Sequence, residues 1–354
     1  MRHSSLCAAT VLTIVVVGLS LGAGEPPAGV FRIGSLTVNP GQSLSGYLDI
    51  PPRQDEGTTI PLTVIHGLLP GPVVACVAGV HGCEYPPILA LYRLRTLIDP
   101  LKLAGTVILV HIANVPSFAR RTVYYTPADW KNLNRVFPGS PDGTLSQRIA
   151  FVLNEEVVGR CDVLLDLHGG DANEALMPYT YWMIGDDPAL NAKSRDLALA
   201  FGLRHIIIDA TRTRDLTDSK YLGNTAILRG KAAITTETGA LGRTDVEYID
   251  MAERGILGVM RHLGMIEGRA EPVANPVWID DYIVLNSGTT GLFTSLVKMG
   301  QNVAAGDRVG FVSDYLGTPR EDIRAPFAGL VLYVIGTPPT SRGEPLIELG
   351  HIKE

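Results

Sequence analysis

Short apolar runs alternate with amphipathic stretches between about residues 70 and 265 of the chain. Residues 73–80 form a continuous apolar run, which is typical of a strand that is covered on both faces. Residues 88–98 follow two prolines and repeat apolar positions with helical spacing. This alternation predicts an α/β fold with a mainly parallel or mixed sheet. Further strands are expected at residues 107–112, 163–167, 205–208 and 232–236, and further helices at residues 144–158, 188–201 and 244–263.

Two short segments have the pattern of a capping box, in which a Ser or Thr pairs with a Glu or Gln three residues later. They lie at residues 144–147 and 244–247. Each is expected to close the first turn of a helix, the first running to Val158 and the second to about Leu263.

The pattern changes after Pro272, where short Val, Ile and Leu runs alternate with Gly, Asp and Pro turns. No helix-length periodicity remains there, so residues 275–354 are predicted to form a small all-β module. Residues 25–270 then form the main domain, in which about residues 30–65 are a lead-in of strands and turns.

Composition excludes several classes of protein. The 354-residue chain is 46% hydrophobic and 19% charged, a balance that excludes disorder as its main state. A formal net charge of −6 offers phosphate backbones no attraction, so no nucleic-acid partner is expected. Four Cys are too few for a disulfide scaffold, and Cys76 and Cys161 are expected to be buried free thiols.

Residues 1–24 have the pattern of a targeting segment. A basic start at Arg2 precedes an apolar run from Leu6 to Leu21, and small residues follow it. This pattern predicts a cleaved secretory signal peptide, because a comfortable membrane span needs about 20 apolar residues. The protein is therefore expected to be exported to the periplasm or the extracellular space, with an uncleaved membrane anchor as the alternative.

Three potential zinc ligands follow two of the predicted strands. His81 and Glu84 lie three residues apart after the first apolar run, and His168 directly follows the predicted strand 163–167. Imidazole and carboxylate both bind zinc, and open α/β sheets bind ligands at the carboxyl ends of their strands. Either motif alone is weak, because a polar surface pair or a structural His gives the same pattern. Together they predict a zinc site with three protein ligands.

Further polar residues accompany these ligands. Asp166 precedes His168 by two residues, and it either orients a metal-bound imidazole or is a buried Asp satisfied by backbone donors. Glu237 follows the strand 232–236, where a carboxylate can take a proton from a water at the metal. Arg135 offers a planar fork that suits a carboxylate or a developing oxyanion, although loop arginines are usually solvated.

The order of these residues and their neighbours resembles the succinylglutamate desuccinylase/aspartoacylase family, relatives of the zinc carboxypeptidases. Residues 81–84 are similar to the family's H-G-x-E motif, and residues 132–139 to its N-L-N-R-x-F-P-G. Residues 166–170 are similar to its D-L-H-G-G, and Glu237 stands in its E-x-G context. Four motifs in this order form a specific resemblance, which covers about residues 70–350.

This resemblance implies a carboxypeptidase-like α/β/α sandwich with a mixed sheet and a small C-terminal barrel-like module. It also implies one Zn²⁺ per chain, a general base and acid, and side chains that hold a substrate carboxylate or carbonyl. The implied residues are His81, Glu84 and His168 for zinc, Glu237 and Arg135 for catalysis, and Asn134 with the weaker candidate Arg121 for substrate binding.

One residue of the first motif and the C-terminal module differ from related patterns. Cys83 stands where the family often has Asn or Asp, and the turn is expected to direct its thiol away from the zinc. The C-terminal module is also similar to lipoyl and biotinyl carriers, which need a Lys at a hairpin tip. Residues 313–324 contain no Lys, so a structural or substrate-gating module is predicted instead.

The favoured function is zinc-dependent hydrolysis of an amide bond in a small N-acylated amino acid or amine, so the expected partner is a small-molecule substrate. One alternative is an extracytoplasmic zinc carboxypeptidase that acts on peptides or wall peptides, and another is a metal-binding protein without turnover. A module that caps the cleft disfavours peptides, and the presence of Glu237 disfavours the loss of turnover. The motifs specify neither the acyl group nor an oligomeric state.

The targeting segment leads to a first prediction. Protein isolated from its native host outside the cytoplasm should begin near Glu25, because Gly22 and Gly24 supply the small residues of a cleavage site. N-terminal sequencing measures this start directly, and an intact Met1 would contradict cleavage.

Overall fold

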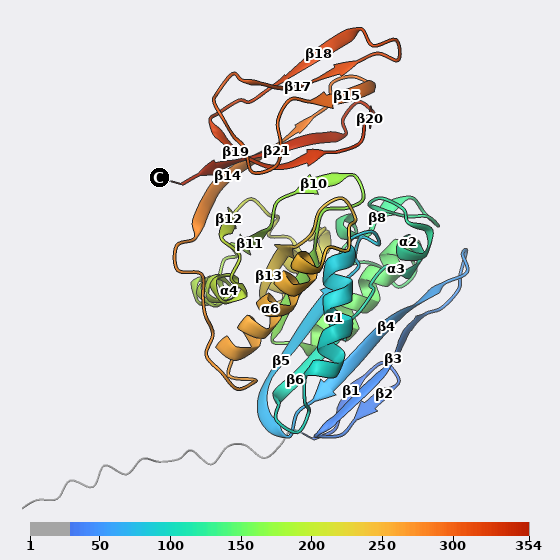
Figure 1. Cartoon of the computed structure of the whole chain (residues 1–354). Helices are drawn as coiled ribbons and strands as arrows, with labels where there is room; N and C mark the ends of the chain where they lie inside the picture. Colours follow the sequence, from blue (N-terminus) through green and yellow to red (C-terminus); the bar gives the residue numbers. More distant parts are fainter. Residues whose placement is uncertain (1–28, 354) are drawn as a thin grey trace, which may run out of the picture.

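A mixed β-sheet with helices on both faces forms the larger part of the molecule, and a smaller module of strands lies above it (Figure 1). This computed structural model describes residues 29–353, so the predicted signal peptide at residues 1–24 lies outside the described residues. The α-helices are α1 (Tyr85–Leu97), α2 (Val115–Arg120), α3 (Leu145–Val152), α4 (Pro188–Phe201), α5 (Leu222–Leu228) and α6 (Val246–His262). The strands before the module are β1 (Phe31–Ile33), β2 (Leu36–Val38), β3 (Gln42–Ile50), β4 (Thr58–His66), β5 (Leu69–Ala78), β6 (Ala104–Val110), β7 (Tyr125–Thr126), β8 (Lys131–Asn132), β9 (Val163–His168), β10 (Glu174–Leu176), β11 (Tyr179–Met183), β12 (His205–Asp209) and β13 (Ala232–Glu237).

Within the described residues, the strands of the larger part follow the order β3-β4-β6-β5-β9-β13-β11-β12. Strands β6, β5, β9 and β13 pair in parallel with one another in this order, whereas β4 is antiparallel to β6 and β11 is antiparallel to β13. The predicted α/β fold with a mixed sheet is therefore confirmed. Because parallel strands end at the same edge of a sheet, the carboxyl ends of β5, β9 and β13 lie together.

Helices cover both faces of this sheet. Helices α1, α4 and α6 pack together, and α1 and α6 lie in front of the sheet in Figure 1, with α3 behind it. Gly258 permits the close approach of α6 to α4, because a Cβ there would lie 2.4 Å from the backbone oxygen of Ala200. Among the described residues, no helix is both long and apolar enough to cross a membrane.

The two predicted capping boxes have different outcomes. Thr144 and Gln147 form the expected box at the start of α3, and helical structure continues beyond Val158 to Arg160 through a π-helical turn. The second box is wrong, because the carbonyl of Asp245 accepts the N–H groups of residues 248 and 249. Asp245 is therefore the N-cap of α6, and the residue three positions later is a Tyr, which cannot complete a box.

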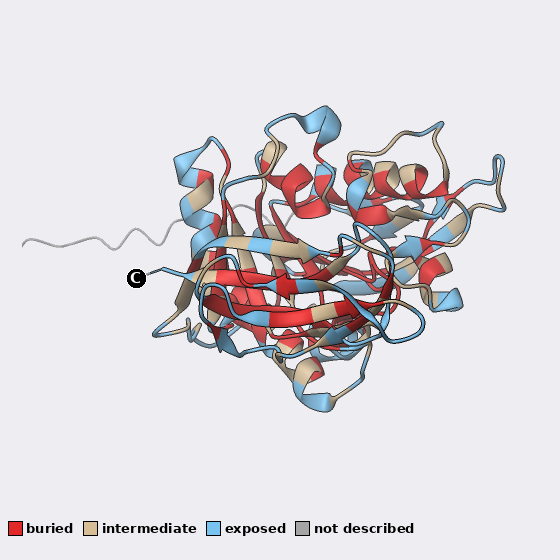
Figure 2. Ribbon diagram, turned by 90° about the horizontal axis from the view of Figure 1, so that it is seen from above, coloured by how far each residue is buried: buried red, intermediate tan, exposed pale blue. Residues whose placement is uncertain are grey.

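The module after residue 275 consists of β-strands, as predicted, and these strands pair with one another in antiparallel fashion. Its strands form a second sheet in the order β18-β17-β15-β20, while β14, β19 and β21 extend the main sheet. Strand β14 pairs in parallel with β12, and β10 pairs with β19, so hydrogen bonds join the two parts of the chain. Figure 2 shows largely buried strands of this module from above. The strands are β14 (Val277–Asn286), β15 (Gly291–Ser295), β16 (Asn302–Val303), β17 (Arg308–Ser313), β18 (Pro319–Arg324), β19 (Gly329–Ile335), β20 (Pro339–Thr340) and β21 (Pro345–Ile352).

Three cysteines lie within the described residues. Cys76 and Cys161 are fully buried free thiols, as predicted from their apolar surroundings in the sequence. Cys83 is also buried and free. None of the three is therefore part of a disulfide framework, and hydrophobic packing stabilises this fold.

Candidate metal centre and active site

The loop after β5 carries His81 and Glu84 to the carboxyl edge of the sheet. Gly82 lies between them, and a Cβ at this position would be 2.1 Å from the backbone nitrogen of Phe118. The N–H of Gly82 also donates to the hydroxyl of Ser117 in α2, at 3.1 Å. Only glycine fits so close to another backbone, so this contact fixes the path of the loop and the directions of both side chains.

The structure brings the three predicted zinc ligands together. Nδ1 of His81 lies 2.7 Å from one carboxylate oxygen of Glu84, and Nδ1 of His168 lies 2.8 Å from the other. One ligand atom from each of the three residues lies within 4.8 Å of the others, and all three side chains are buried. Two nitrogens and one oxygen donor at this spacing form a set that suits zinc and leaves room for a further ligand.

The opposite nitrogen of each imidazole has its own polar partner. Nε2 of His81 lies 3.0 Å from Oδ1 of Asn132, and Nε2 of His168 lies 3.0 Å from Oδ1 of Asp166. When Nε2 donates to these oxygens, Nδ1 keeps its lone pair for a metal, which is the usual arrangement around metal-binding histidines. Asp166 therefore makes the contact that an orienting role requires. Asn132 makes the same kind of contact to His81, although no pattern in the sequence indicates it.

The electrostatics of this cluster also fit a cation. Burial alone would raise the pKa of Glu84, but the imidazoles of His168 and His81 lower it to about 2. Burial alone would lower the pKa of His168, but the carboxylates of Asp166 and Glu84 raise it. The cluster therefore stabilises positive charge between its side chains, and a divalent cation can take the place of the protons.

Glu237 is the last residue of β13 and lies beside His168 in the parallel pairing of β13 with β9. It is partly buried and lines the same cavity as the three ligands. Burial raises its pKa well above the usual value, and the charges of Glu84, Glu174 and Glu348 add to this, while His168 opposes it. A carboxyl group with a raised pKa next to a metal cluster is suited to accept and return a proton.

The predicted substrate-binding residues have different positions. Arg135 and Asn134 lie in a short 3₁₀ turn and line the cavity, and the Arg135 guanidinium lies 4.6 Å from the ring centroid of Tyr221. Oδ1 of Asn134 accepts the N–H of Leu222, which fixes this side chain against α5. Arg121 ends α2 in an exposed left-handed conformation and is not among the described residues that line the cavity.

Arg212 is a cavity residue that the sequence argument missed. Its side chain is only 15% exposed, its Nε donates to Asp209, and its guanidinium lies 3.8 Å from the Tyr221 ring centroid. Arg135 and Arg212 therefore contact the same aromatic ring and give the cavity two guanidinium groups. In the sequence, nothing distinguishes Arg212 from Arg214, because only the folded loop selects which of them faces inward.

Two further carboxyl groups, those of Asp171 and Glu174, have raised pKa values near the candidate site. Both oxygens of Asp171 accept backbone N–H groups, and burial first, then the charge of Glu84, raise its pKa to about 6. Glu174 lines the cavity and accepts the N–H of Asp171, and Tyr124 donates to it at 2.9 Å. Both groups are engaged in holding their loop, whereas Glu237 faces the cavity beside the ligands.

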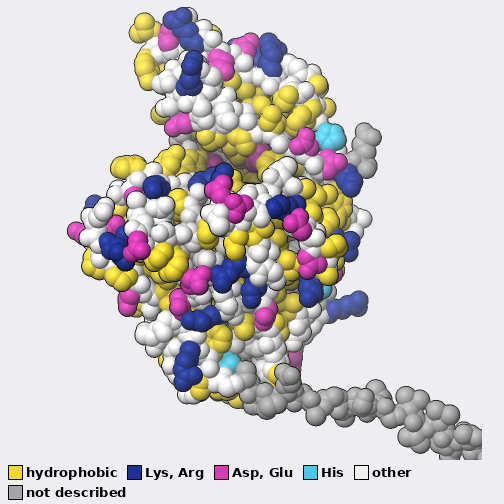
Figure 3. Space-filling model, turned by 180° about the vertical axis from the view of Figure 1, so that it is seen from behind, with side chains coloured by type: hydrophobic (Ala, Val, Ile, Leu, Met, Phe, Trp, Pro, Cys, Tyr) yellow, Lys and Arg dark blue, Asp and Glu magenta, His cyan; other side chains and the backbone are white. Residues whose placement is uncertain are grey.

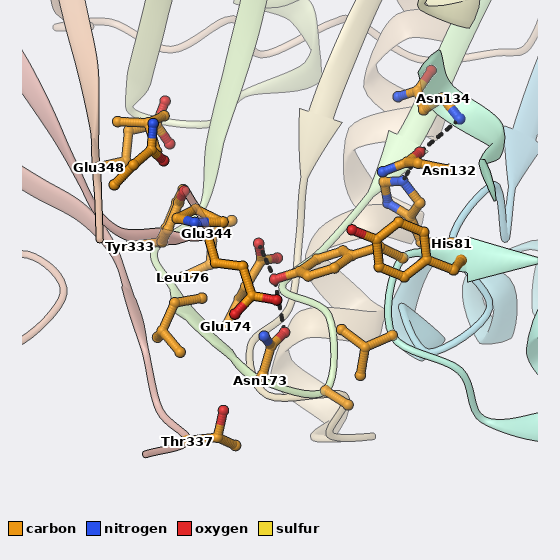
Figure 4. A pocket seen from close by; sticks show the side chains of 18 of the residues that line it. His81, Asn132, Asn134, Asn173, Glu174, Leu176, Tyr333, Thr337, Glu344 and Glu348 are labelled. Atoms are coloured by element: carbon orange, nitrogen blue, oxygen red, sulfur yellow. Dashed lines mark hydrogen bonds between the residues drawn. The ribbon is translucent and has the colours of Figure 1, made fainter. Parts of the chain in front are cut away.

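The candidate site opens into a cavity of about 1500 Å³ between the sheet edge and the C-terminal module. Figure 3 shows, from behind, that the molecular surface narrows between these two parts. Figure 4 shows His81 and Asn132 on one side of the cavity and Glu348 and Tyr333 of the module on the other. The module therefore supplies one wall of the cavity.

A mixed sheet with helices on both faces, and with a buried His-Glu-His cluster and a further carboxylate at its strand ends, defines an α/β fold with a candidate metal centre. The family model of the succinylglutamate desuccinylase/aspartoacylase catalytic domain matches residues 70–263. The chain belongs to this family, whose members include deacylases that hydrolyse amide bonds.

Similar proteins support this assignment. N-alpha-acetyl-L-2,4-diaminobutyric acid deacetylase of Halomonas elongata is 32% identical over 280 residues, which are 76% of this chain and 79% of that protein. A succinylglutamate desuccinylase/aspartoacylase structure from Rhodobacter sphaeroides has 27% identity and a TM-score of 0.79, covering 92% of this chain and 100% of that one. The product-bound ectoine utilization protein EutE (DoeB) from Ruegeria pomeroyi has 26% identity and a TM-score of 0.78, covering 91% of this chain and 98% of that one.

The cluster geometry predicts the effect of two substitutions on metal content. The His168→Ala variant should lose zinc, because two remaining ligands bind a catalytic metal poorly. The Cys83→Ser variant should keep one zinc per chain, since its Sγ lies 3.8 Å from the carbonyl of Thr122 and 3.8 Å from the hydroxyl of Tyr85, outside the ligand cluster. Metal analysis of both purified variants, with circular dichroism to verify folding, measures this. Zinc lost from the Ser variant and retained by the Ala variant would contradict the ligand assignment.

Proposed function

We propose that this protein is a zinc-dependent hydrolase that cleaves the amide bond of a small N-acylated amino acid or amine. The observation that carries this proposal is the position of Glu237, which lies beside His168 and lines the same cavity as all three candidate ligands. The deacetylase from Halomonas elongata supports the reaction type, since its name describes removal of an acetyl group from an amino acid nitrogen.

His81, Glu84 and His168 would hold the zinc, with Asn132 and Asp166 orienting the two imidazoles. Bound zinc supplies Lewis-acid chemistry, which activates water and polarises the acyl carbonyl.

Glu237 performs the proton transfers of the proposed reaction. Its carboxylate accepts a proton from the attacking water and then donates it to the nitrogen of the leaving amine. Burial and the neighbouring carboxylates raise its pKa well above the usual value, which favours the protonated form that the second step needs. The leaving nitrogen of an amide needs this proton, because an amine anion is a poor leaving group.

Arg135 and Asn134 are proposed to position the substrate. The guanidinium of Arg135 is suited to a substrate carboxylate or to the oxyanion of the tetrahedral intermediate. Its Nη1 donates to the backbone carbonyl of Asn134 at 2.8 Å, and Arg135 lines the same cavity as the three candidate ligands. Arg212, which contacts the same Tyr221 ring, is a second anchor for an anionic group.

Two rival functions remain distinguishable by experiment. A carboxypeptidase that acts on peptides outside the cytoplasm would need an open cleft, whereas the module forms a wall of this cavity. A metal-binding protein without turnover has no need for Glu237.

Zinc-loaded protein should release amino acids from N-acyl amino acids and not from peptides with a free C-terminus. Release from the peptides alone would support the carboxypeptidase and contradict the deacylase. Export, which the N-terminal sequence indicates, is part of this proposal.

The proposed roles predict that the Glu237→Gln variant separates binding from chemistry. This variant should keep its zinc and near-normal KM, because Gln preserves the shape of the side chain and Glu237 is not a ligand. Its kcat should fall by about 10²–10⁴-fold, the usual contribution of general acid–base catalysis. Metal analysis and steady-state kinetics on an N-acyl amino acid measure both quantities.

The control is Glu247→Gln, which makes the same change at an exposed position of α6. It should leave zinc content and kcat unchanged. Loss of zinc from the Glu237→Gln variant would make Glu237 a ligand, and retention of more than half its activity would place the base elsewhere.

A further inference from the structure

We propose that the C-terminal module contributes a cation subsite to the cavity, in which Glu348 binds a second, unacylated ammonium group of the substrate. The favoured substrates are then N-acylated diamino acids rather than acylated amino acids with neutral or acidic side chains. This inference rests on the proposed function, because it assigns the substrate class of the same site.

Glu348 is a buried carboxyl group with little compensation from the protein. It lies on β21, is only 2% exposed, and lines the cavity. The hydroxyl of Tyr179 donates to Oε2 of Glu348 at 3.2 Å. Among the described residues, Glu348 has this one hydrogen-bond partner. A carboxylate has about four acceptor positions, so most of its hydrogen-bonding capacity is open to a ligand.

No ion pair joins Glu348 to another described residue. The guanidinium of Arg212 lies close enough to lower the pKa of Glu348, but it is paired with Asp209. Burial is the largest effect and raises the pKa of Glu348 to about 8, and the charge of Glu174 adds to it. An unpaired buried carboxylate is costly, and a ligand ammonium would supply the missing charge.

Aromatic rings surround this carboxyl group. Tyr333 on β19 is directly opposite Glu348 in the strand pairing, and Tyr179 and Tyr181 contact each other edge to face at 5.3 Å. Burial first, and then the charge of Glu348, raise the pKa of all three hydroxyl groups, which places them within its electrostatic reach. Ring faces attract cations, so a carboxylate among tyrosines is suited to an ammonium group.

The other carboxyl groups of the cavity already have roles. Glu84 and Asp166 contact the imidazoles, Glu237 is the proposed base, and Glu174 is held by Asp171 and Tyr124. The guanidiniums of Arg135 and Arg212 suit the carboxylate of an amino acid, and they are outnumbered by the acidic residues of the lining. Glu348 is thus the buried acidic group of the wall that has no ion-pair partner among the described residues and no role in the proposed reaction.

The experiment compares two substrates of matched shape, Nα-acetyl-2,4-diaminobutyrate and N-acetylnorvaline, whose side chains differ by an ammonium and a methyl group. The wild-type protein should favour the diamino substrate in kcat/KM by about 10- to 100-fold, the usual value of a charge-assisted hydrogen bond. The Glu348→Gln variant should reduce this ratio to near one. Gln resembles the protonated carboxyl group that burial favours, so the variant should keep its fold, and thermal unfolding verifies this.

The matched control is Glu344→Gln, which removes a carboxylate from an exposed position of the same cavity rim. It should leave the ratio unchanged. Calorimetric binding of the two deacetylated products, 2,4-diaminobutyrate and norvaline, should show the same Glu348-dependent preference without any turnover.

The pH dependence provides a further readout. Glu348 ionises above a pKa of about 8, whereas a substrate ammonium of the lysine type stays charged to about pH 10. The preference for the diamino substrate should therefore increase from pH 6.5 to pH 8.5 in the wild-type protein. Glu174 titrates in the same range, with a pKa of about 7. Other titratable or charged groups also face this region: Asp209, Arg212, Glu237 and the tyrosines at positions 179, 181, 282 and 333. A flat profile in the Glu348→Gln variant assigns the increase to Glu348.

Three outcomes would overturn the inference: equal use of both substrates by the wild-type protein, an unchanged ratio in the Glu348→Gln variant, or product binding without a preference for the diamine. An equal loss of both activities in that variant would make Glu348 a structural residue. If neither amide is hydrolysed while 2,4-diaminobutyrate binds in a Glu348-dependent manner, the proposed hydrolase function fails and the cation subsite stands.

Discussion

The parallel pairing of β5, β9 and β13 is the constraint on which the site depends. These strands run in the same direction, so residues at or just after their carboxyl ends meet at one edge, although His81 and Glu237 are more than 150 positions apart in the chain. His168 and Glu237 are exact register partners across β9 and β13, and the loop after β5 adds His81 and Glu84. The contacts among His81, Glu84 and His168 follow from this arrangement.

Close backbone contacts then make the edge rigid. Gly82 lies against α2, and Gly169 lies so near the carbonyl of Thr238 that a Cβ would be 2.6 Å from it. Larger residues at these positions would push the loops apart and separate the imidazoles from Glu84. A site built on such contacts is held in place before a metal or a substrate binds, which is the general requirement for precise catalytic geometry.

The C-terminal module changes the environment of this edge. It adds aromatic and acidic side chains, among them Tyr333 and Glu348, to a wall of the cavity. Burial then raises the pKa of Glu237, Glu174 and Glu348, while the imidazoles keep Glu84 ionised. Carboxyl groups in the same cavity therefore have pKa values shifted in opposite directions, because their nearest charged neighbours differ.

The sequence alone determined the fold class, the order of most strands and helices, and the residues of the candidate metal centre. These features depend on local periodicity and on motifs a few residues long, which are visible in the chain itself. It mispredicted the box before α6, where a one-residue shift of the helix start decides the pairing. Only the tertiary structure decided that Asn132 orients His81, that Arg212 rather than Arg214 faces inward, and that Glu348 lines the cavity. Each of these positions depends on contacts between segments that are distant in sequence, and no local pattern encodes which of several similar polar residues the packing will bury.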